Sequence, residues 1–320
     1  MTGTISNSTR LKEPRLIDLP KIPDPRGNLS FIENEAQIPF RIARCYWIYD
    51  VPGGEVRHGH AFHHATELIV ALSGSFDIVV TAPDGSETTY HMARSYKGLL
   101  LPPMTWRRLD NFSTNSVAMV LSSTPYMPED YIEDLDTYRS ICKNGLSYYS
   151  PSIIPTACPG GHSHDNDCRK GLTGIDSHST SRLGDCRIIE LPRHRHANGS
   201  LTVVDNRCSI FNVKRVFYLY DVPGDSSRGG HSHREAQEIM TAASGSFDVT
   251  LSDGHDTRTF SLNRPYRGLY IPAGIWRNLD NFSSGAVSLV LTSELYSEHD
   301  YVRDYEVFKR LTADKVNLPV

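Results

Sequence analysis

The sequence has few cysteines, no long apolar run and little net charge, and each shortage excludes a class of protein. Its 320 residues contain six cysteines, too few for a disulfide scaffold of this length. No apolar run approaches the roughly 18 residues that a membrane-spanning helix needs, and the N-terminal MTGTISNSTRLKEP lacks the apolar core of a signal peptide. A net charge of −4 offers no attraction for nucleic acid or an anionic membrane. We therefore expect a cytoplasmic protein with neither partner.

Much of the sequence is present twice. FRIARCYWIYDVPG at 40–53 returns as FNVKRVFYLYDVPG at 211–224, and SYKGLLLPPMTWRRLDNFS at 95–113 returns as PYRGLYIPAGIWRNLDNFS at 265–283. A repeat of about 130 residues has the size of a domain rather than of a solenoid unit. The chain is therefore a tandem duplication.

Each copy has the pattern of an all-β domain. Short runs rich in Val, Ile, Tyr and Phe alternate with Gly, Pro and Asp turns, and only the tails from Glu129 and Glu298 show a helical pattern. We expect an N-terminal domain over 15–139, a linker over 140–186 and a C-terminal domain over 187–311. A structureless stretch of that length is acceptable between two domains.

The linker contains one candidate metal site. Cys158, His162, His164 and Cys168 have the spacing C-x3-H-x-H-x3-C. This is not a usual structural zinc pattern, and the surrounding residues resemble a loop. An ordinary flexible linker is the favoured interpretation, with zinc as the alternative.

The stretch from Arg228 to Glu238 holds the strongest chemical signal. His231 and His233 project from one face of a predicted strand, with Glu238 close behind. This spacing matches the first motif of metal-binding cupins, but Arg277 stands where their second motif has a histidine. Because a guanidinium offers only donors and stays charged, it cannot be a ligand. Proton transfer is therefore favoured over metal binding.

The first copy is further from a metal site. His60 aligns with His231, but Phe62 replaces the second histidine, whereas Glu67 and Arg107 are kept together with Arg57. We expect no metal in either copy.

Tyrosines near these histidines are candidates for proton relay or for binding sugar hydroxyls. Tyr218 and Tyr220 lie on the strand that precedes Arg228, and Tyr46 lies on the matching strand of the first copy. The same tyrosines are equally explained as core and surface residues of a strand.

The long signature RVFYLYDVPG, RGGHSHR, SGSFDV and GLYIP, followed by a tryptophan and DNFS, resembles the sugar 3,4-ketoisomerases. These are WxcM-like cupins that act on dTDP-4-keto-6-deoxyglucose. The resemblance covers both copies and implies two tandem cupin domains, that is, double-stranded β-helix or jelly-roll domains, each with a short C-terminal helix. Family members are usually single cupins that dimerise, so the fused pair implies an intramolecular pseudo-dimer. A further pairing into a homo-oligomer stays open.

The resemblance also implies a reaction without metal or other cofactor. A base removes the C3′ proton of the dTDP-linked 4-keto-6-deoxy sugar, an enediol forms, and a proton returns at C4′. The residues expected to be catalytic are His231, His233, Tyr218 and His60. The residues expected to bind substrate are Arg228, Arg277, Tyr220, Glu238, Arg57, Tyr46 and Arg107.

Alternatives to this function are a metal-dependent cupin enzyme, a non-catalytic sugar-binding bicupin and a 3,5-epimerase. The loss of the second histidine at Phe62 indicates that the second copy carries most of the activity. The sequence does not choose between the two C4′ epimers of the product, nor does it identify the nucleotide base.

Overall fold

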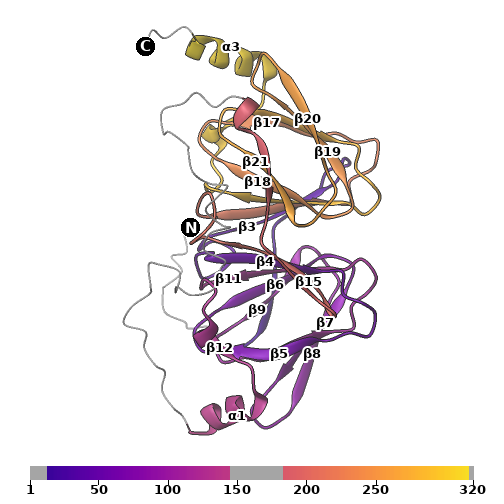
Figure 1. The fold of residues 1–320 in the computed structure, drawn as a ribbon, viewed down its shortest axis with the longest axis vertical. Helices are drawn as coiled ribbons and strands as arrows, with labels where there is room; N and C mark the ends of the chain where they lie inside the picture. The colour runs from indigo at the N-terminus through magenta and orange to yellow at the C-terminus, as the bar shows by residue number, and fades with distance from the viewer. Residues whose placement is uncertain (1–12, 145–182, 317–320) are drawn as a thin grey trace, which may run out of the picture.

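The computed structural model of the protein describes residues 13–144 and 183–316. Two β-rich units are stacked along the long axis of the molecule (Figure 1). The candidate zinc residues between Cys158 and Cys168 lie outside the described residues. Within the described ranges, neither helix is long and apolar enough to cross a membrane.

Each unit is a seven-stranded sheet packed on a five-stranded sheet, which is the expected all-β cupin architecture. The first unit has the orders β1-β9-β6-β11-β4-β15-β14 and β12-β5-β10-β7-β8, and the second has β13-β21-β18-β23-β16-β3-β2 and β20-β19-β22-β17-β24. The strands of the first copy are β1 (Arg15–Asp18), β2 (Lys21–Ile22), β3 (Asn28–Glu33), β4 (Arg44–Tyr49), β5 (Arg57–Phe62), β6 (Glu67–Ser73), β7 (Phe76–Thr81), β8 (Glu87–Met92), β9 (Lys97–Leu101), β10 (Trp106–Asp110), β11 (Val117–Ser122) and β12 (Tyr131–Ile132). Those of the second copy are β13 (Arg187–Glu190), β14 (Arg193–His196), β15 (Gly199–Asp205), β16 (Arg215–Tyr220), β17 (Arg228–His233), β18 (Glu238–Ser244), β19 (Phe247–Ser252), β20 (Thr257–Leu262), β21 (Arg267–Ile271), β22 (Trp276–Asp280), β23 (Val287–Thr292) and β24 (Tyr301–Val302).

The two copies exchange a hairpin. Strand β3 of the first copy pairs antiparallel with β16, where Phe31 lies opposite Phe217. Strand β15 of the second copy pairs in the same way with β4, where Thr202 lies opposite Trp47. Each unit therefore contains one hairpin from the other copy, β2–β3 or β14–β15, and the chain is an intramolecular pseudo-dimer.

A continuous apolar core joins the two units. Trp47, Tyr49, Tyr218 and Tyr220 are all buried in it together with aliphatic residues of both copies. The Trp47 indole donates from Nε1 to the backbone oxygen of Pro265 at 3.0 Å, across the boundary between the units. Separate clusters fill the space between the two sheets of each unit.

The helix at the end of each copy begins later than the acidic residues of the tail indicated. Helix α1 spans Leu135–Asn144 and α3 spans Tyr305–Val316. Each follows a single 3₁₀ turn and a two-residue strand, β12 or β24. The start of α1 is fixed by Asp134, whose Oδ2 accepts a hydrogen bond from the Thr137 backbone at 2.7 Å.

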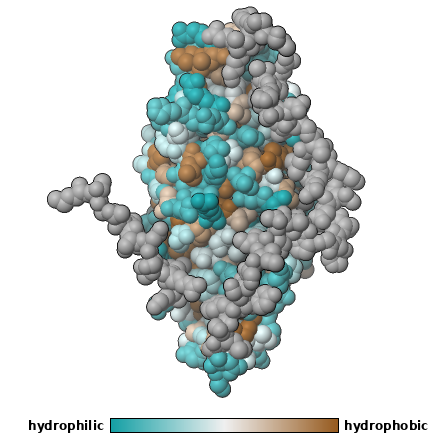
Figure 2. All heavy atoms as spheres, turned by 90° about the vertical axis from the view of Figure 1, so that its left-hand side faces the viewer, coloured by the Kyte–Doolittle hydropathy of each residue, from teal (hydrophilic) through white to brown (hydrophobic). Residues whose placement is uncertain are grey.

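On the face shown in Figure 2, apolar side chains are scattered among hydrophilic ones. Two of the large exposed aromatic side chains lie at cavities. Tyr126 and Tyr296 are 51% and 52% exposed, and each lines one of the two cavities described next.

Candidate active site

Each unit contains a cavity between its sheets, and these two cavities are nearly equal in size. The second cavity, of about 440 Å³, lies among β16, β17, β18 and β22. The first cavity, of about 450 Å³, lies among the matching strands β4, β5, β6 and β10. Because of the hairpin exchange, Leu29 and Phe31 of the first copy line the second cavity, and Leu201 and Val203 of the second copy line the first. Each cavity is therefore built from both copies.

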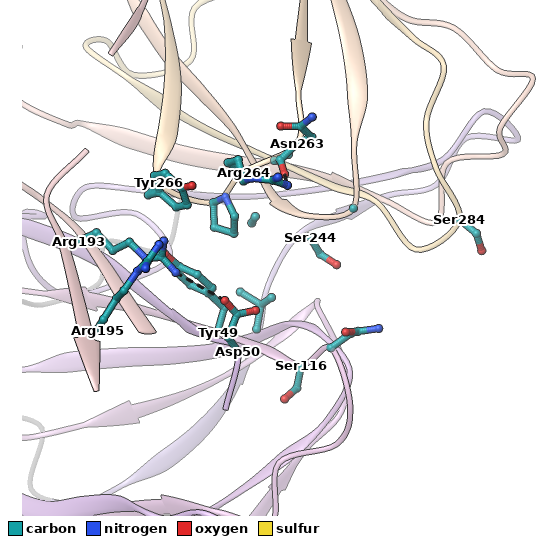
Figure 3. Close-up of a pocket in the computed structure, with 16 residues that line it drawn as sticks. Tyr49, Asp50, Ser116, Arg193, Arg195, Ser244, Asn263, Arg264, Tyr266 and Ser284 are labelled. Atoms are coloured by element: carbon teal, nitrogen blue, oxygen red, sulfur yellow. Dashed lines mark hydrogen bonds and ion pairs between the residues drawn. The ribbon is translucent and has the colours of Figure 1, made fainter. Parts of the chain in front are cut away.

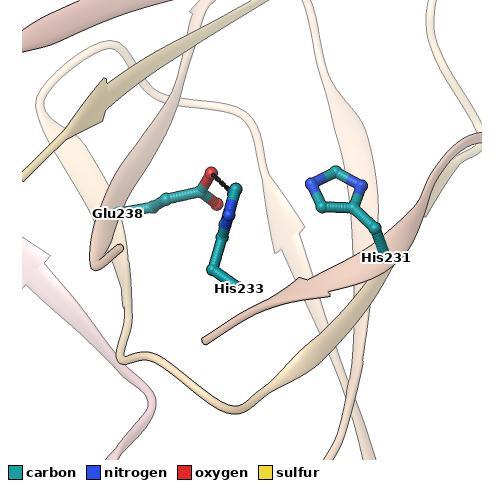
Figure 4. Close-up of side chains that lie close together, drawn as sticks. All are labelled: His231, His233 and Glu238. Carbon is teal, nitrogen blue, oxygen red and sulfur yellow. Dashed lines mark hydrogen bonds and ion pairs between the residues drawn. The ribbon is translucent and has the colours of Figure 1, made fainter. Parts of the chain in front are cut away.

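In the second unit, His233 is held between two carboxylates. Its Nε2 lies 3.1 Å from Oε1 of Glu238, and its Nδ1 lies 2.7 Å from Oδ2 of Asp300. All three side chains are buried. Figure 4 shows the His233 ring against Glu238 and the His231 ring standing apart from both. Both nitrogens of His233 thus lie within ion-pair distance of a carboxylate.

His231 has a different environment. Its ring makes a hydrogen bond to the Gly229 backbone, whereas its Nε2 is buried without a hydrogen-bond partner among the described residues. Burial lowers the pKa of His231 well below its usual value, and the nearby Arg277 guanidinium lowers it further. The ring is therefore neutral near pH 7, and the Gly229 contact leaves the lone pair on Nε2.

A β-bulge places His231 at this position. The register between β17 and β22 shifts between Gly229 and His231, which lies opposite Arg277. Gly229 has a φ of 92°, and a Cβ there would lie 2.8 Å from the backbone oxygen of Arg277. The bulge therefore requires a residue without a side chain at position 229, and the Arg-Gly-Gly-His sequence supplies a glycine there.

Arg277 forms a buried ion pair beside the histidines. Its Nη2 lies 2.8 Å from Oε1 of Glu238, and the two side chains are 2% and 1% exposed. Burial alone would raise the pKa of Glu238, but Arg277 and the hydrogen bond with His233 lower it overall. Glu238 therefore stays ionised.

His231, His233 and Glu238 are also the described residues that come closest to a metal site, since their ligand atoms lie within 4.8 Å of one another. The same Glu238 oxygen, however, faces both His233 and Arg277. A divalent cation would have to displace the guanidinium from Glu238 and would still be repelled by its positive charge. These residues therefore do not fit a metal in this arrangement. We derive no catalytic step through one.

The mouth of the second cavity carries charges from both copies. Arg228 Nη1 lies 2.9 Å from Oδ2 of Asp24, which also accepts a hydrogen bond from Arg26 at 2.8 Å. That hydrogen bond, more than the charge of Arg228, lowers the pKa of Asp24. Arg228 thus lies in the cavity as expected, held by a residue that the sequence reasoning had not selected.

The expected positions of Tyr218 and Tyr220 are wrong. Strand β16 presents Arg215, Phe217 and Leu219 to the cavity, and the alternation of side chains turns both tyrosines toward the core between the units. The Tyr218 hydroxyl donates to the backbone oxygen of Ser95, and the Tyr220 hydroxyl lies 3.1 Å from Ser30 Oγ.

A different tyrosine lies in the second cavity. The Tyr301 ring centre lies 5.0 Å from that of His231 and 4.4 Å from that of His233, and its hydroxyl accepts a hydrogen bond from Arg215 at 3.3 Å. Burial raises its pKa. Tyr301 and Asp300 were missed by the sequence reasoning, although an Asp-Tyr pair follows the last long strand in both copies, at 130–131 and 300–301.

The first cavity brings together all its expected residues. Arg107 donates to Oε2 of Glu67 and approaches Nε2 of His60 closely. Tyr46 donates to Oε1 of Glu67 at 2.8 Å. At the mouth, Arg57 donates to Oδ1 of Asn198, a residue of the second copy, at 2.9 Å.

A third cavity, of about 540 Å³, lies between the two units (Figure 3). Arg193, Arg195 and Arg264 line it together with Tyr266 and Asp50. No histidine is among the described residues that line it. It therefore lacks a group suited to proton transfer near neutral pH, and we do not regard it as the active site.

Comparisons with known proteins identify the family of this chain. The family described as FdtA, WxcM-like, C-terminal, matches residues 12–143 and 184–313. The TDP-4-oxo-6-deoxy-alpha-D-glucose-3,4-oxoisomerase of Aneurinibacillus thermoaerophilus is 35% identical over 133 residues, which cover 41% of this chain and 95% of that protein.

Two solved structures are also similar. A 3,4-ketoisomerase from Helicobacter canadensis is 37% identical over 41% of this chain and 98% of its own, with a TM-score of 0.40. QdtA, a sugar 3,4-ketoisomerase from Thermoanaerobacterium thermosaccharolyticum in complex with TDP, is 32% identical over 42% of this chain and 98% of its own, with a TM-score of 0.41. Because the two family matches together span most of the sequence, this chain belongs to the WxcM-like FdtA family as a tandem pair of its domains.

Proposed function

We propose that the chain is a nucleotide-sugar 3,4-ketoisomerase acting on TDP-4-keto-6-deoxyglucose, and that the second cavity is its catalytic site. The named activity of the Aneurinibacillus relative supports the reaction. The observation that carries the assignment to this cavity is His231, a neutral base whose Nε2 has no hydrogen-bond partner among the described residues. Such a base suits removal of a proton next to a ketone.

The reaction moves a carbonyl group between neighbouring carbons. A base removes the C3′ proton, and the electron pair forms a C3′–C4′ double bond while negative charge develops on the C4′ oxygen. The C4′ oxygen then takes up a proton, the C3′ hydroxyl loses its own, and a proton returns at C4′, so that C4′ carries a hydroxyl and the carbonyl is now at C3′. No electron acceptor is needed, because the oxidation of C3′ balances the reduction of C4′.

His231 is the better candidate for the base of the two histidines. Both nitrogens of His233 face carboxylates, from Glu238 and Asp300. We assign His233 to a supporting role, in which it fixes the wall beside His231. Its ring lies edge-on to His231, with ring centres 5.1 Å apart.

Arg277 and Arg228 are the candidates for charge stabilisation and binding. Arg277 lies directly opposite His231 on the neighbouring strand, where a fixed cation would favour the enediolate as it forms. Arg228 lines the same cavity nearer its mouth and is available to the phosphate groups of the nucleotide.

The test is turnover in D2O followed by NMR. The wild-type chain should convert TDP-4-keto-6-deoxyglucose into a 3-keto sugar that carries solvent deuterium. His231→Asn should lower turnover by about 1,000-fold, within the usual range for loss of a general base. His60→Asn is the matched control and should retain most activity. Abolition of turnover by His60→Asn alone would show that we chose the wrong cavity.

A further inference from the structure

The first cavity lacks the arrangement that would let it transfer protons. Phe62 occupies the place of His233, with its ring centre 5.0 Å from that of His60 and 4.5 Å from that of Tyr131. Asp130, which corresponds to Asp300, accepts hydrogen bonds from the His64 backbone at 2.7 Å and from Thr124 Oγ1 at 3.5 Å, and Phe62 stands where His233 pairs with Asp300. The second histidine and its two carboxylate contacts are therefore lost together.

The remaining histidine is also engaged. Arg107 Nη1 contacts His60 Nε2, the nitrogen whose counterpart in His231 has no partner. The same guanidinium bonds Glu67. Burial, and then the charge of Arg107, lowers the pKa of His60 well below its usual value. His60 is poorly suited to remove a proton, because its Nε2 is already in contact with a cation, whereas that of His231 is not.

The cavity nevertheless remains open and keeps polar groups directed at a ligand. Its volume, about 450 Å³, is not reduced relative to the about 440 Å³ of the second cavity. Arg44 lines it and is only 3% exposed, yet its Nε and Nη2 have no hydrogen-bond partner among the described residues. A guanidinium offers only donors, so the missing partner is an acceptor such as a sugar or phosphate oxygen.

The equivalent arginine of the second cavity, Arg215, already has acceptors for its Nε and Nη2 donors. Arg215 donates from Nε to Thr292 Oγ1 at 3.4 Å and from Nη2 to Tyr301 at 3.3 Å. In the first cavity, Ser122 stands where Thr292 would be. Within the part of the chain that the structure describes, Arg44 hydrogen-bonds Tyr131 at 3.2 Å, and its guanidinium lies over the ring of Tyr46. At this position, the unmet donors therefore occur in the first cavity and not in the second.

The mouth of the first cavity has also diverged. His196, Asn198 and Glu133 line it at the positions that Asp24, Arg26 and Arg303 occupy in the second cavity. Its apolar walls, in contrast, keep their character, with Ile48, Leu109 and Val120 in the places of Leu219, Leu279 and Val290. A ligand of similar size and shape is accommodated with different polar contacts.

We propose that the first cavity binds a nucleotide-linked sugar without turning it over, so that each chain has one catalytic and one purely binding site. The class of ligand rests on the proposed function, whereas the loss of catalysis rests on Phe62 and on the Arg107–His60 contact. Arg44 supplies the donors that complete the site.

Calorimetric titration of the full chain with TDP-4-keto-6-deoxyglucose tests this proposal, with His231→Asn present so that no sugar is consumed. Two sugars should bind per chain. Adding Arg44→Met should weaken one of the two sites by about 100-fold, as expected for the loss of charge-assisted hydrogen bonds. In a chain that keeps His231, Arg44→Met should leave the isomerisation rate within about twofold.

Two further variants protect the interpretation. Asn198→Asp adds a negative charge at the mouth without touching the core, and it should also weaken the first site if Arg44→Met does not fold. Arg195→Met alters the third cavity and should leave two sugars bound. The inference would be overturned if the His231→Asn chain bound fewer than two sugars. It would also be overturned if neither Arg44→Met nor Asn198→Asp weakened either of the two sites. Two bound sugars with no isomerisation by the wild-type chain would instead refute the proposed function alone.

Discussion

Replacing Asp300 with asparagine should weaken the second unit by removing a charge that His233 needs. Asp300 is 8% exposed, and its Oδ2 lies 2.7 Å from Nδ1 of His233. Its Oδ1 accepts a hydrogen bond from the Glu235 backbone at 2.7 Å. Asparagine can keep that backbone contact through its own oxygen but loses the negative charge beside the ring.

The size of the effect follows from the pKa of Asp300. Burial would raise this pKa, but the hydrogen bonds from His233 and from the Glu235 backbone lower it from 3.8 to about 2. This difference corresponds to about 2 kcal/mol of stability at pH 7. Because the folded-state pKa is the lower one, the contribution is present above pH 3.8 and is lost as the pH falls toward 2. About half should remain at pH 3.

Urea unfolding of the wild-type chain and of Asp300→Asn at pH 7 and pH 3 measures this difference, and Asp130→Asn is the matched control. Asp130 makes the corresponding backbone contact, with His64, but Phe62 replaces the histidine in its unit. Asp130→Asn should therefore cost under about 1 kcal/mol. Asp300→Asn should also lower kcat, because His233 is no longer fixed beside His231. Equal losses of stability in the two variants, or a loss for Asp300→Asn that does not shrink at pH 3, would refute the reasoning.

Three further predictions concern the metal, pH and the hairpin exchange. Prolonged chelation should leave the isomerisation rate unchanged, because Arg277 already pairs with Glu238, the carboxylate that a metal would need. Loss of activity on chelation that a divalent cation restores would contradict this. In a pH–rate profile, the fall of kcat/KM on the acidic side should occur below pH 6.5, since burial and Arg277 lower the pKa of His231. Arg277→Met should move this fall to higher pH. Residues 183–316 expressed alone should aggregate and be inactive, because β16 loses its partner β3. When residues 13–144 are supplied, size-exclusion chromatography should show a soluble complex and isomerase activity should return. A monomeric, active fragment would refute that expectation.

The duplication and the all-β units could be predicted because they depend on local pattern. Residues 211–224 repeat 40–53 almost position by position, and the alternation of turns with β-branched runs indicates strands. The hairpin exchange could not be predicted this way. Strands β4 and β16 have similar patterns, so the sequence alone does not show which of them pairs with β3, and the structure pairs it with β16.

The site was predictable where residues are close in the sequence. His231, His233 and Glu238 lie close together in the sequence, at the end of β17 and the start of β18, and the structure brings their side chains together. Strand periodicity indicates that Tyr218 and Phe217 face opposite ways, but it does not indicate which face meets the cavity. Because a second unit covers one face of β16, the tyrosines there became core residues. Asp300 was missed because only the fold brings β24 beside β17.

The hairpin exchange also constrains how this sequence can change over time. A dimer of identical chains must carry two identical sites, whereas this fused pair holds two different ones in a fixed one-to-one ratio. Arg26 is encoded in the first copy but lines the cavity of His231, and Asn198 is encoded in the second copy but contacts Arg57 of the first. A substitution in either hairpin therefore alters the chemistry of the opposite copy. Neither half can be optimised, duplicated or deleted without changing the other.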